Sequence, residues 1–353
     1  MCSSPTGWRD YRVFSVFEMN KLIKILKEWT LPVAMSTGIL VYFIFYFTPA
    51  LDGASKVFNE FFDFILPWIL FVILFVTFCR ADFHRMRPCW WHACILAMQL
   101  VLVIVCTAFI MNYHAPGNRL ILMECIICCV ICPCATAAPV VTAKLDGDLE
   151  KMTTFMLLSN FLAAILIPVV FPLVDESIDM PFWDAFIALL ERVCSVLVAP
   201  MGLAYIVKHF APRLHRLIIS NKDLSFYLWG VLLLVISGAT MRNIMNSGTT
   251  FWFIVIIGLI SLVITFVQFA IGRYVGRFFH ATTEMGQAMG QKNTAFAIWV
   301  SSAWLNPLAA VGPGFYILWQ NMFNSLEIWH HERAASQTHK QTPTEPTTLG
   351  KSQ

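Results

Sequence analysis

Charged residues are scarce in this chain. Asp, Glu, Lys and Arg make up 13% of its 353 residues, whereas hydrophobic residues make up 58%. Soluble domains carry about twice that share of charge, so the composition excludes an ordinary water-soluble fold. The mean hydropathy is also positive, at +0.69. We therefore predict an all-α polytopic membrane protein.

Signatures of soluble enzymes are missing as well. The sequence has no Walker-type phosphate loop, no His-Glu-x-x-His zinc helix and no Gly-x-Ser-x-Gly elbow. Its apolar stretches hold no paired carboxylates, His cluster or nucleophile beside a base. We expect no enzyme activity, no nucleotide-driven pump and no cofactor. The net charge of +3 follows from topology and gives no indication of nucleic-acid binding.

Apolar stretches of roughly 17 to 25 residues, long enough to cross a bilayer, recur along the chain. About ten spans are predicted, at residues 29–48, 61–79, 93–111, 120–143, 151–174, 190–210, 224–241, 251–272, 283–306 and 312–330. The first has no small-residue cleavage site, so we expect it to stay in the mature protein. The ends are predicted to be a cytoplasmic N-terminal segment, 1–28, and a disordered cytoplasmic tail, 331–353.

The positions of Lys and Arg predict the orientation in the bilayer. With both termini in the cytoplasm, the outer loops hold only Lys56, Arg119 and Arg242, and most other cations lie in inner loops. This asymmetry agrees with the positive-inside rule. Two cations, Arg192 and Lys292, fall inside spans. We expect an integral protein of the cell (inner) membrane, and the sequence predicts no oligomeric state.

The two halves of the chain resemble one another. The spacing of spans in residues 29–174 recurs in residues 175–330, and Pro49 matches Pro212 at the same offset. Each half holds five predicted spans, an odd number, so the second half must cross the membrane in the opposite sense. The pattern predicts two inverted five-helix repeats.

The fourth and ninth spans are both interrupted at mid-membrane depth. The interruptions are Cys132–Pro139 and Gly290–Thr294. A bilayer has no water to satisfy freed backbone groups, so a helix breaks there only where its open ends face protein or a polar cavity. Paired interruptions in two halves are typical of secondary transporters and indicate one shared binding site.

Side chains at the interruptions predict how the half-helices begin. Thr136 is placed to cap one of them, with Pro139 in its first turn, and Asn293 or Thr294 is placed to cap the other. Two helix N-termini would then meet near the midplane, and such ends favour anions. A proline kink and a close-packing Gly290 are the alternative interpretation.

Lys292 is the most informative single residue. An ammonium at the bilayer centre costs roughly 2.5 to 3.5 kcal/mol, so it should face a cavity or a partner. Glu124 is one possible partner, although it also fits a headgroup position. The predicted substrate contacts are Thr136, Gln287, Gln291, Lys292, Asn293 and Thr294, and the predicted coupling residues are Lys292, Glu124 and Asn160.

Cysteines crowd into the fourth span, at Cys125, Cys128, Cys129, Cys132 and Cys134. A Cys-Pro-Cys sequence could bind a soft metal through thiolates. Thiols in apolar surroundings stay protonated, however, and act as small packing residues. We therefore favour packing and predict no metal site.

At these residues the sequence resembles the bile acid:sodium symporter family. The most specific stretches are Cys132–Ala137, Val140–Thr142, Leu145–Asp148 and Gly290–Thr294. The resemblance implies ten helices divided into a panel domain, of spans one, two, six and seven, and a core domain of the others. It also implies that helices four and nine cross at unwound centres, and that organic anions, from bile acids to small carboxylates, move by alternating access.

Two departures from the family pattern concern sodium. Where the sodium-coupled members have an acid and a Gln in the ninth span, this chain has Ala288 and Lys292, and their Ser-Asn in the fourth span becomes Ala138-Pro139. Sodium prefers oxygen ligands, and here a carboxylate, a hydroxyl and an amide are replaced. We expect sodium coupling to be absent, with Lys292 supplying the positive charge.

The predicted function is secondary transport of a small organic anion, with that anion and the lipid bilayer as partners. One alternative is a metalloid exporter, similar to arsenite permeases, that uses Cys132 and Cys134. Another is a membrane sensor that keeps the transporter fold without moving its ligand.

Overall fold

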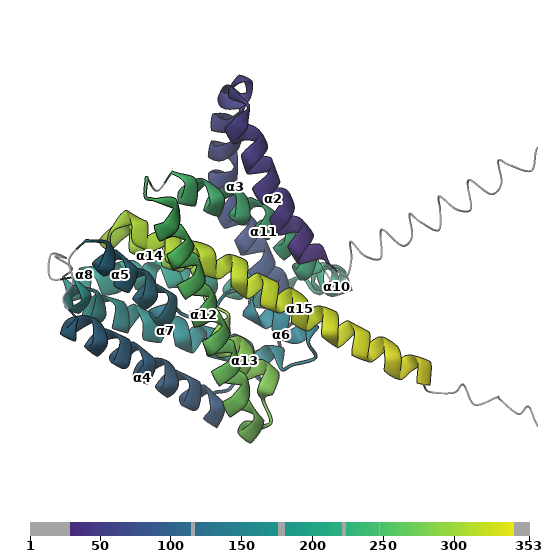
Figure 1. Ribbon diagram of the computed structural model, residues 1–353. Coiled ribbons are helices and arrows are strands. Elements are labelled where there is room, and N and C mark those ends of the chain that lie inside the picture. Colours follow the sequence, from purple (N-terminus) through teal and green to yellow (C-terminus); the bar gives the residue numbers. More distant parts are fainter. Residues whose placement is uncertain (1–28, 114–116, 176–180, 221–223, 247, 342–353) are drawn as a thin grey trace, which may run out of the picture.

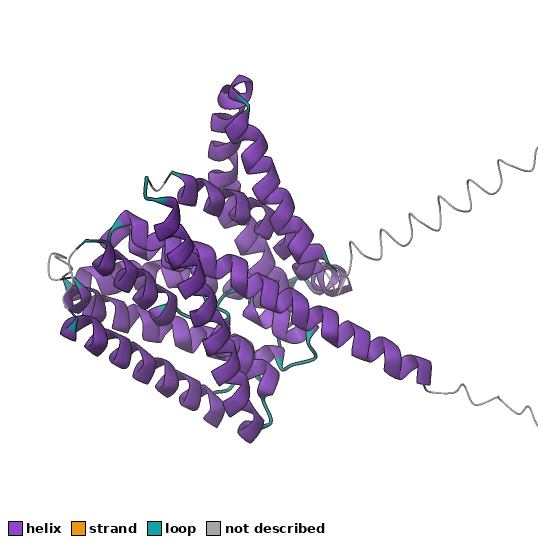
Figure 2. Ribbon diagram, viewed as in Figure 1, coloured by secondary structure: helices purple, strands orange, loops and turns teal. Residues whose placement is uncertain are grey.

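The protein is built from helices. A computed structural model describes residues 29–113, 117–175, 181–220, 224–246 and 248–341, and within these ranges helices joined by short loops make up the fold (Figure 2). The predicted N-terminal segment, 1–28, lies outside the described residues. The all-α prediction is confirmed for the described part of the chain.

Helices occupy each of the ten predicted ranges. Six are long and apolar enough to cross a membrane, at Thr30–Phe47, Trp90–Asn112, Leu149–Val174, Phe182–Phe210, Leu224–Arg242 and Phe251–Phe279, and a shorter apolar helix covers Phe64–Arg80. The chain is therefore an integral membrane protein. The fourth and ninth ranges do not meet the length criterion because each is divided into two short helices.

One group of helices packs around α11 (Leu224–Met245). Helix α2 (Thr30–Phe47) lies along α11, while α3 (Asp52–Arg80) contacts both α11 and α9 (Ala199–Phe210). The ends of α2 and α3 project from the rest of the molecule (Figure 1). Gly38 permits the close approach of α2 to α11, because a Cβ at this position would overlap the backbone oxygen of Leu234.

The second group contains the broken spans. The fourth consists of α5 (Asn118–Ile131) and α6 (Ala138–Lys144), and the ninth of α13 (Thr282–Gly290) and α14 (Thr294–Trp304). Around them pack the long helices α4 (Trp90–Asn112), α7 (Leu149–Val174), α12 (Phe251–Gly276) and α15 (Val311–Gln341).

The remaining elements connect these groups. The sixth span starts as α8 (Phe182–Val193), passes through a π-helical turn η2 (Cys194–Val198), and continues as α9. After it, α10 (Pro212–Ser220) leads to α11. Short 3₁₀ turns occur at η1 (Pro49–Leu51), η3 (Arg277–Phe279) and η4 (Pro307–Ala310).

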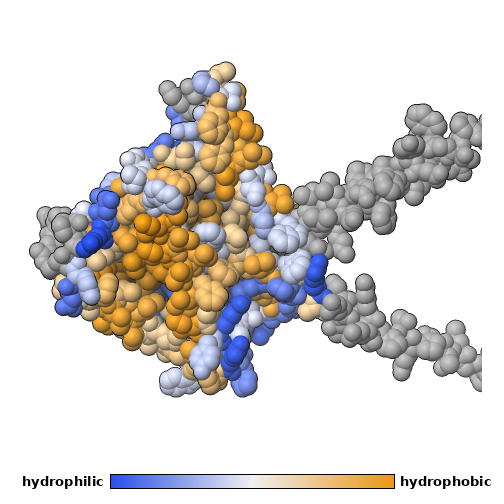
Figure 3. Space-filling view, in the orientation of Figure 1, coloured by the Kyte–Doolittle hydropathy of each residue, from blue (hydrophilic) through white to orange (hydrophobic). Residues whose placement is uncertain are grey.

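The surface is apolar where a bilayer would contact it. Leu259, Val263 and Phe266 lie at four- and three-residue intervals on α12, and each is more than half exposed. Apolar residues fill the middle of the face drawn in Figure 3, with hydrophilic residues gathered at its edges. Such a large exposed apolar surface is expected of a protein that faces lipid.

The C-terminal boundary needs a correction. Helix α15 continues to Gln341, beyond residue 331, where the tail was expected to begin. The composition of Thr, Gln, Pro and Ser becomes dense only after this helix, so the hydrophilic residues just beyond the apolar span extend α15 instead of ending it. Residues 342–353 lie outside the described residues.

Candidate functional site

The first break is held by side chains from neighbouring helices. Cys132 is extended, as the residue before a proline usually is. Gln99 on α4 donates hydrogen bonds from Nε2 to the carbonyl oxygens of Ile131 (3.2 Å) and Cys132 (3.1 Å). The backbone N–H of Cys134 donates to Ser159 Oγ on α7 at 3.0 Å. Backbone groups freed by the break are thus satisfied inside the protein, as a membrane interior requires.

The second break is held by α15. Gln320 brackets Lys292, accepting from its backbone N–H at 2.9 Å and donating to its carbonyl at 3.2 Å. The hydroxyl of Tyr316 donates to the carbonyl of Gly290 at 2.7 Å. Side-chain amide and hydroxyl groups therefore satisfy the backbone groups at the break that a continuous helix would pair with its own backbone.

The two breaks are hydrogen-bonded to each other. The N–H of Ala135 donates to the carbonyl of Gln291 (2.9 Å), and the N–H of Asn293 donates to the carbonyl of Pro133 (2.8 Å). These bonds form an isolated antiparallel bridge between residues 134 and 292. Residues far apart in the sequence thus form one structural unit at the middle of both spans.

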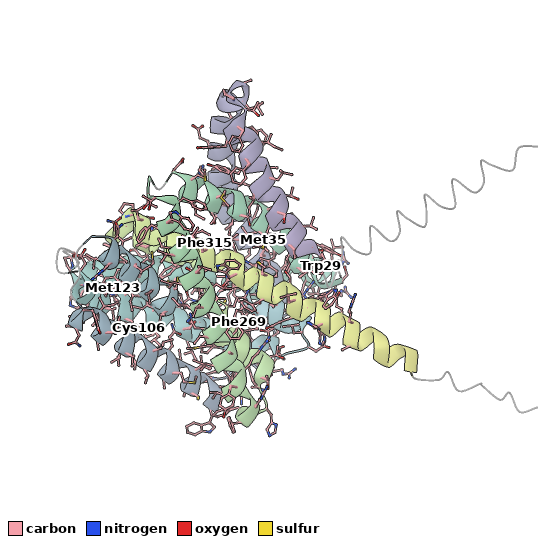
Figure 4. All side chains as sticks on the ribbon, viewed as in Figure 1. Trp29, Met35, Cys106, Met123, Phe269 and Phe315 are labelled. Atoms are coloured by element: carbon pink, nitrogen blue, oxygen red, sulfur yellow. The ribbon has the colours of Figure 1, made fainter. Side chains whose placement is uncertain are left out.

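Gly290 allows α13 to approach α12. A Cβ at this position would overlap the ring of Phe269, a residue of α12 labelled in Figure 4. The close packing places the end of α13, and therefore the second break, against α12. Gly290 is thus both a close-packing residue and the last residue of α13. Close helix packing and a break in the span are therefore compatible at this glycine.

The two new half-helices begin differently. Asn293 caps α14, as predicted, by accepting from the N–H of Phe296 at 3.2 Å. Thr136 does not cap α6: the residue at that position is Ala137, with no side-chain hydrogen bond. The expectation for Thr136 is therefore wrong, because the chain makes one more turn before the helix starts. Pro139 lies in the first turn of α6, as expected.

A cavity of about 440 Å³ opens at the paired breaks. Its polar wall is formed by Thr136, Gln291, Lys292, Asn293 and Thr294, with Gln320 and Asn321 of α15. The remaining wall is largely apolar and comes mainly from α3 and α11, through Leu66, Pro67, Leu70, Phe71, Trp229, Leu232 and Leu233. The sixth span adds Arg192, Ser195 and Val196 to it. The volume lies in the range of small-molecule sites, about 300 to 1,000 Å³.

Lys292 is almost fully buried, with 1% of its surface exposed. Its Nζ has no hydrogen-bond partner among the described residues. The predicted ion pair with Glu124 is absent from the described residues, so Lys292 is an uncompensated charge inside the protein.

Five of the six predicted substrate contacts line the cavity and Gln287 does not. Gln287 instead donates from Nε2 to Asn324 (3.1 Å) and to Glu327 (2.8 Å), and Glu327 pairs with Arg273. The helix phase is reset at the break, so a residue on α13 need not share a face with residues of α14. The prediction for Gln287 is not supported by its position.

The other predicted coupling residues lie on two different helices, α5 and α7. Glu124, on α5, is 1% exposed, and neither carboxyl oxygen has a hydrogen-bond partner among the described residues. Asn160, on α7, donates to the carbonyls of Met156 (2.8 Å) and Cys134 (3.5 Å). Asn160 also lines a second cavity, of about 40 Å³, together with Asn293 and Arg192.

Sequence reasoning did not assign roles to three residues that hold the site. Gln99 and Tyr316 bond to the breaks, and Gln268 donates to both Tyr316 Oη (3.2 Å) and the carbonyl of Cys129 (3.3 Å). Each is a polar group in an apolar span, which is the signal that could have found them.

Two positions at the breaks offer sodium no side-chain ligand. Ala288 and Ala138 are fully buried and offer no side-chain oxygen, and Pro139 lies beside Ala138 in the first turn of α6. The unpaired ammonium of Lys292 lies at the same break. A hard cation needs several oxygen ligands, and a fixed positive charge nearby opposes its binding.

Outside the apolar spans, Asp148 caps α7. It accepts from the N–H of Lys151 (2.9 Å) and pairs with its ammonium (3.0 Å). Partial burial opposes ionisation of Asp148, but these contacts outweigh it, so the pKa of this carboxyl is lowered. The preceding loop is anchored by Glu284, which accepts from the N–H of Asp148 at 2.8 Å.

Comparison with known families agrees with this geometry. The model of the sodium bile acid symporter family matches residues 67–247, about half of the chain. The chain belongs to the sodium bile acid symporter family. The match includes the first break but ends before the second. No curated protein matches the chain. Membership implies a membrane protein for secondary transport and not an enzyme.

Proposed function

We propose that the protein moves a small organic anion across the membrane by alternating access, without sodium. The observation that carries this proposal is the pair of hydrogen-bonded breaks at one cavity, with a buried lysine between them. Broken helices near the midplane mark the substrate site of many secondary transporters. Here the site carries positive charge, so an anion is the complementary substrate.

In the proposed architecture, ten spans form two inverted repeats. The panel domain consists of α2, α3, α8–α9 and α11, and the core domain consists of the other spans, with the fourth and ninth crossing at their breaks. The packing of α2 and α3 against α11, and of α9 against α3, supports this division. The cavity lies where α3 and α11 face the breaks. Movement of one domain against the other would expose that cavity to each side in turn.

Lys292 takes the place of a coupling cation in this proposal. Its ammonium is part of the protein, so the charge that stabilises the paired breaks does not have to be bound from solution. The absence of acceptors at Ala288 and Ala138 removes the usual reason to recruit sodium. The cost of burying the charge, roughly 2.5 to 3.5 kcal/mol, is offset when an anionic substrate enters the cavity.

The substrate contacts in this proposal are Thr136, Gln291, Asn293 and Thr294, which line the cavity together with Lys292. Gln291 supports this role most directly, because both polar atoms of its side chain lack partners among the described residues. Buried amides without partners are costly. A carboxylate and its neighbouring polar groups would satisfy them.

Coupling, if any, is assigned to Glu124 and Asn160 with Lys292. Glu124 is a buried carboxyl group without a hydrogen-bond partner in the described chain, and such a group is what a proton-coupled step requires. Asn160 links the first break to the small second cavity. Proton-driven uptake would distinguish this coupling from uniport.

The metalloid alternative is weaker on this geometry. Cys132 and Cys134 are buried, at 1% and 0% exposure, and neither lines the main cavity. The described residues contain no group of three or more His, Cys, Asp or Glu that could hold a metal ion. Replacing both cysteines by Ser should therefore leave anion binding intact.

The test is a thermal-shift screen of the purified protein against cholate, lactate and arsenite, each with and without sodium. We expect an organic anion to raise the melting temperature, because a ligand that binds only the folded state stabilises it. Counterflow of the same anion in proteoliposomes then separates a transporter from a sensor. Stabilisation by arsenite alone, or binding without counterflow, would overturn the proposal.

A further inference from the structure

A second cation lies on the cavity wall. Arg192 is on α8, whose first residue is Phe182, so it lies about 15 Å along the helix axis. That distance is half the thickness of a bilayer core, about 30 Å. Arg192 lines both the main cavity and the smaller one beside Asn160. An arginine at this depth is costly and marks a functional position unless it has a partner.

The guanidinium has no carboxylate partner among the described residues. The guanidinium contacts an aromatic ring: Cζ lies 4.2 Å from the ring centroid of Trp299 on α14. A cation over an aromatic face keeps its N–H groups directed outward in the plane of the guanidinium. Arg192 is therefore positioned by Trp299 while its hydrogen-bond donors stay available to the cavity.

The helix is distorted at the same place. The π-helical turn η2 begins two residues after Arg192, and Ser195 within it donates from Oγ to the carbonyl of Arg192 at 3.0 Å. Ser195 and Val196 line the main cavity beside Arg192. π-helical turns inside α-helices occur frequently at functional sites, and this one directs a cation and a hydroxyl toward one cavity.

We propose that Arg192 is the residue that binds the anionic headgroup of the substrate and makes the site prefer an acid over its neutral ester. The assignment rests on the proposed transport function and deepens it. A planar guanidinium binds a carboxylate through two parallel hydrogen bonds. The apolar body would lie against Leu66, Phe71, Trp229 and Leu233, which line the same cavity.

Arg192 and Lys292 then have different roles. Lys292 is 1% exposed, and its backbone N–H donates to Gln320. Its charge is therefore fixed at the paired breaks. Arg192 lies across the cavity on α8 and contacts α14 through a ring. Because the contact joins a helix assigned to the panel with one assigned to the core, a substrate held by Arg192 would bind between the two moving parts.

The test compares an acid with its neutral ester. Cholate and cholate methyl ester are titrated into the wild-type protein and into Arg192→Gln, Arg192→Lys and, as the matched control on α10, Arg213→Gln. Arg192 is exposed in the protein without substrate, and loss of hydrogen bonds to a charged group costs about tenfold or more in affinity. We expect Arg192→Gln to lose cholate affinity by about that factor while ester affinity stays within about twofold, so that the preference for the acid disappears. Arg192→Lys should keep part of the preference, and Arg213→Gln all of it.

A second measurement uses the unmodified chain in case Arg192→Gln does not fold. Phenylglyoxal labels arginine side chains, and mass spectrometry locates each labelled residue. Saturating cholate should slow the labelling of Arg192, whereas the methyl ester should slow it much less and Arg213 should be unaffected by either.

An unchanged preference for the acid in Arg192→Gln, or equal labelling of Arg192 with and without bound cholate, would overturn the assignment. Binding of no organic acid by the wild-type protein, tested also with a naphthoate and an alkyl sulfonate, would instead overturn the proposed transport function. The two failures are therefore distinguishable.

Discussion

The two breaks that meet at the cavity are held in different ways. The first, between α5 and α6, is held from α4 and α7 by Gln99 and Ser159. The second, between α13 and α14, is held from α15 by Gln320 and Tyr316 and carries Lys292. The second break therefore carries the buried charge and, at Gly290, a close approach to Phe269. Variants should have larger effects there than at the first break.

The largest effect is expected from Gly290→Val. The new side chain would overlap the ring of Phe269, and overpacking of this kind typically costs 1–3 kcal/mol, here about 3. The melting temperature should fall and anion binding should be lost. Gly202→Ala is the matched control, because a Cβ there meets nothing within 4 Å, and it should leave both unchanged. Recovery of the melting temperature in Gly290→Val with Phe269→Ala would show that the clash is the cause.

Gln320→Leu should have the next largest effect. The substitution removes both hydrogen bonds to the backbone of Lys292 and leaves its buried N–H unsatisfied, at about 1–3 kcal/mol, whereas its carbonyl keeps the bond from the N–H of Thr294. The corresponding change at the first break is Gln99→Leu, which removes bonds to two carbonyl groups only. Chemical denaturation should show a greater loss for Gln320→Leu. Equal losses would remove the distinction between the breaks.

A smaller effect is expected at the starts of the half-helices. Asn293→Ala removes the cap of α14 and should cost about 1 kcal/mol, whereas Thr136→Ala should cost less because Thr136 makes no capping bond. Thermal unfolding without ligand measures both. Thr136→Ala as destabilising as Asn293→Ala would show that the two helices start alike.

The smallest effect concerns Asp148, outside the spans. Its pKa is lowered in the folded protein, so its stabilisation is present at neutral pH and is lost as pH falls through the unfolded value, about 4, toward the lower folded value. Asp148→Asn should lower stability by at most about 1 kcal/mol at pH 7, and by less near pH 4. Melting curves across this pH range test it. A difference that grows as pH falls would contradict the assigned cause.

The positions of the breaks could be predicted from the sequence because Pro133 and Gly290 interrupt apolar runs in a medium without water. The membership in the family and the all-helical fold followed from the same residues and motifs. These features depend on residues close together in the sequence, so they can be predicted without knowing how the helices pack.

The directions in which side chains point, and therefore their partners, could not be predicted in the same way. Gln287 was expected at the cavity and instead bonds to Asn324, because the break resets the helical phase between α13 and α14. Glu124 was one possible partner of Lys292, with a headgroup position as the alternative, and no bond joins the two side chains. The contact of Arg192 with Trp299 depends on how α8 packs against α14, and spacing along the chain does not determine that packing.

The most direct test of the central claim is uptake of radiolabelled cholate into proteoliposomes. Uptake is compared in sodium and in potassium buffer, for the wild-type and Lys292→Gln proteins. Arg216→Gln on α10 is the matched control. The account predicts wild-type uptake within about twofold in the two buffers and a loss of about tenfold or more in Lys292→Gln. A steep sodium requirement in the wild-type protein, together with full activity of Lys292→Gln, would contradict it.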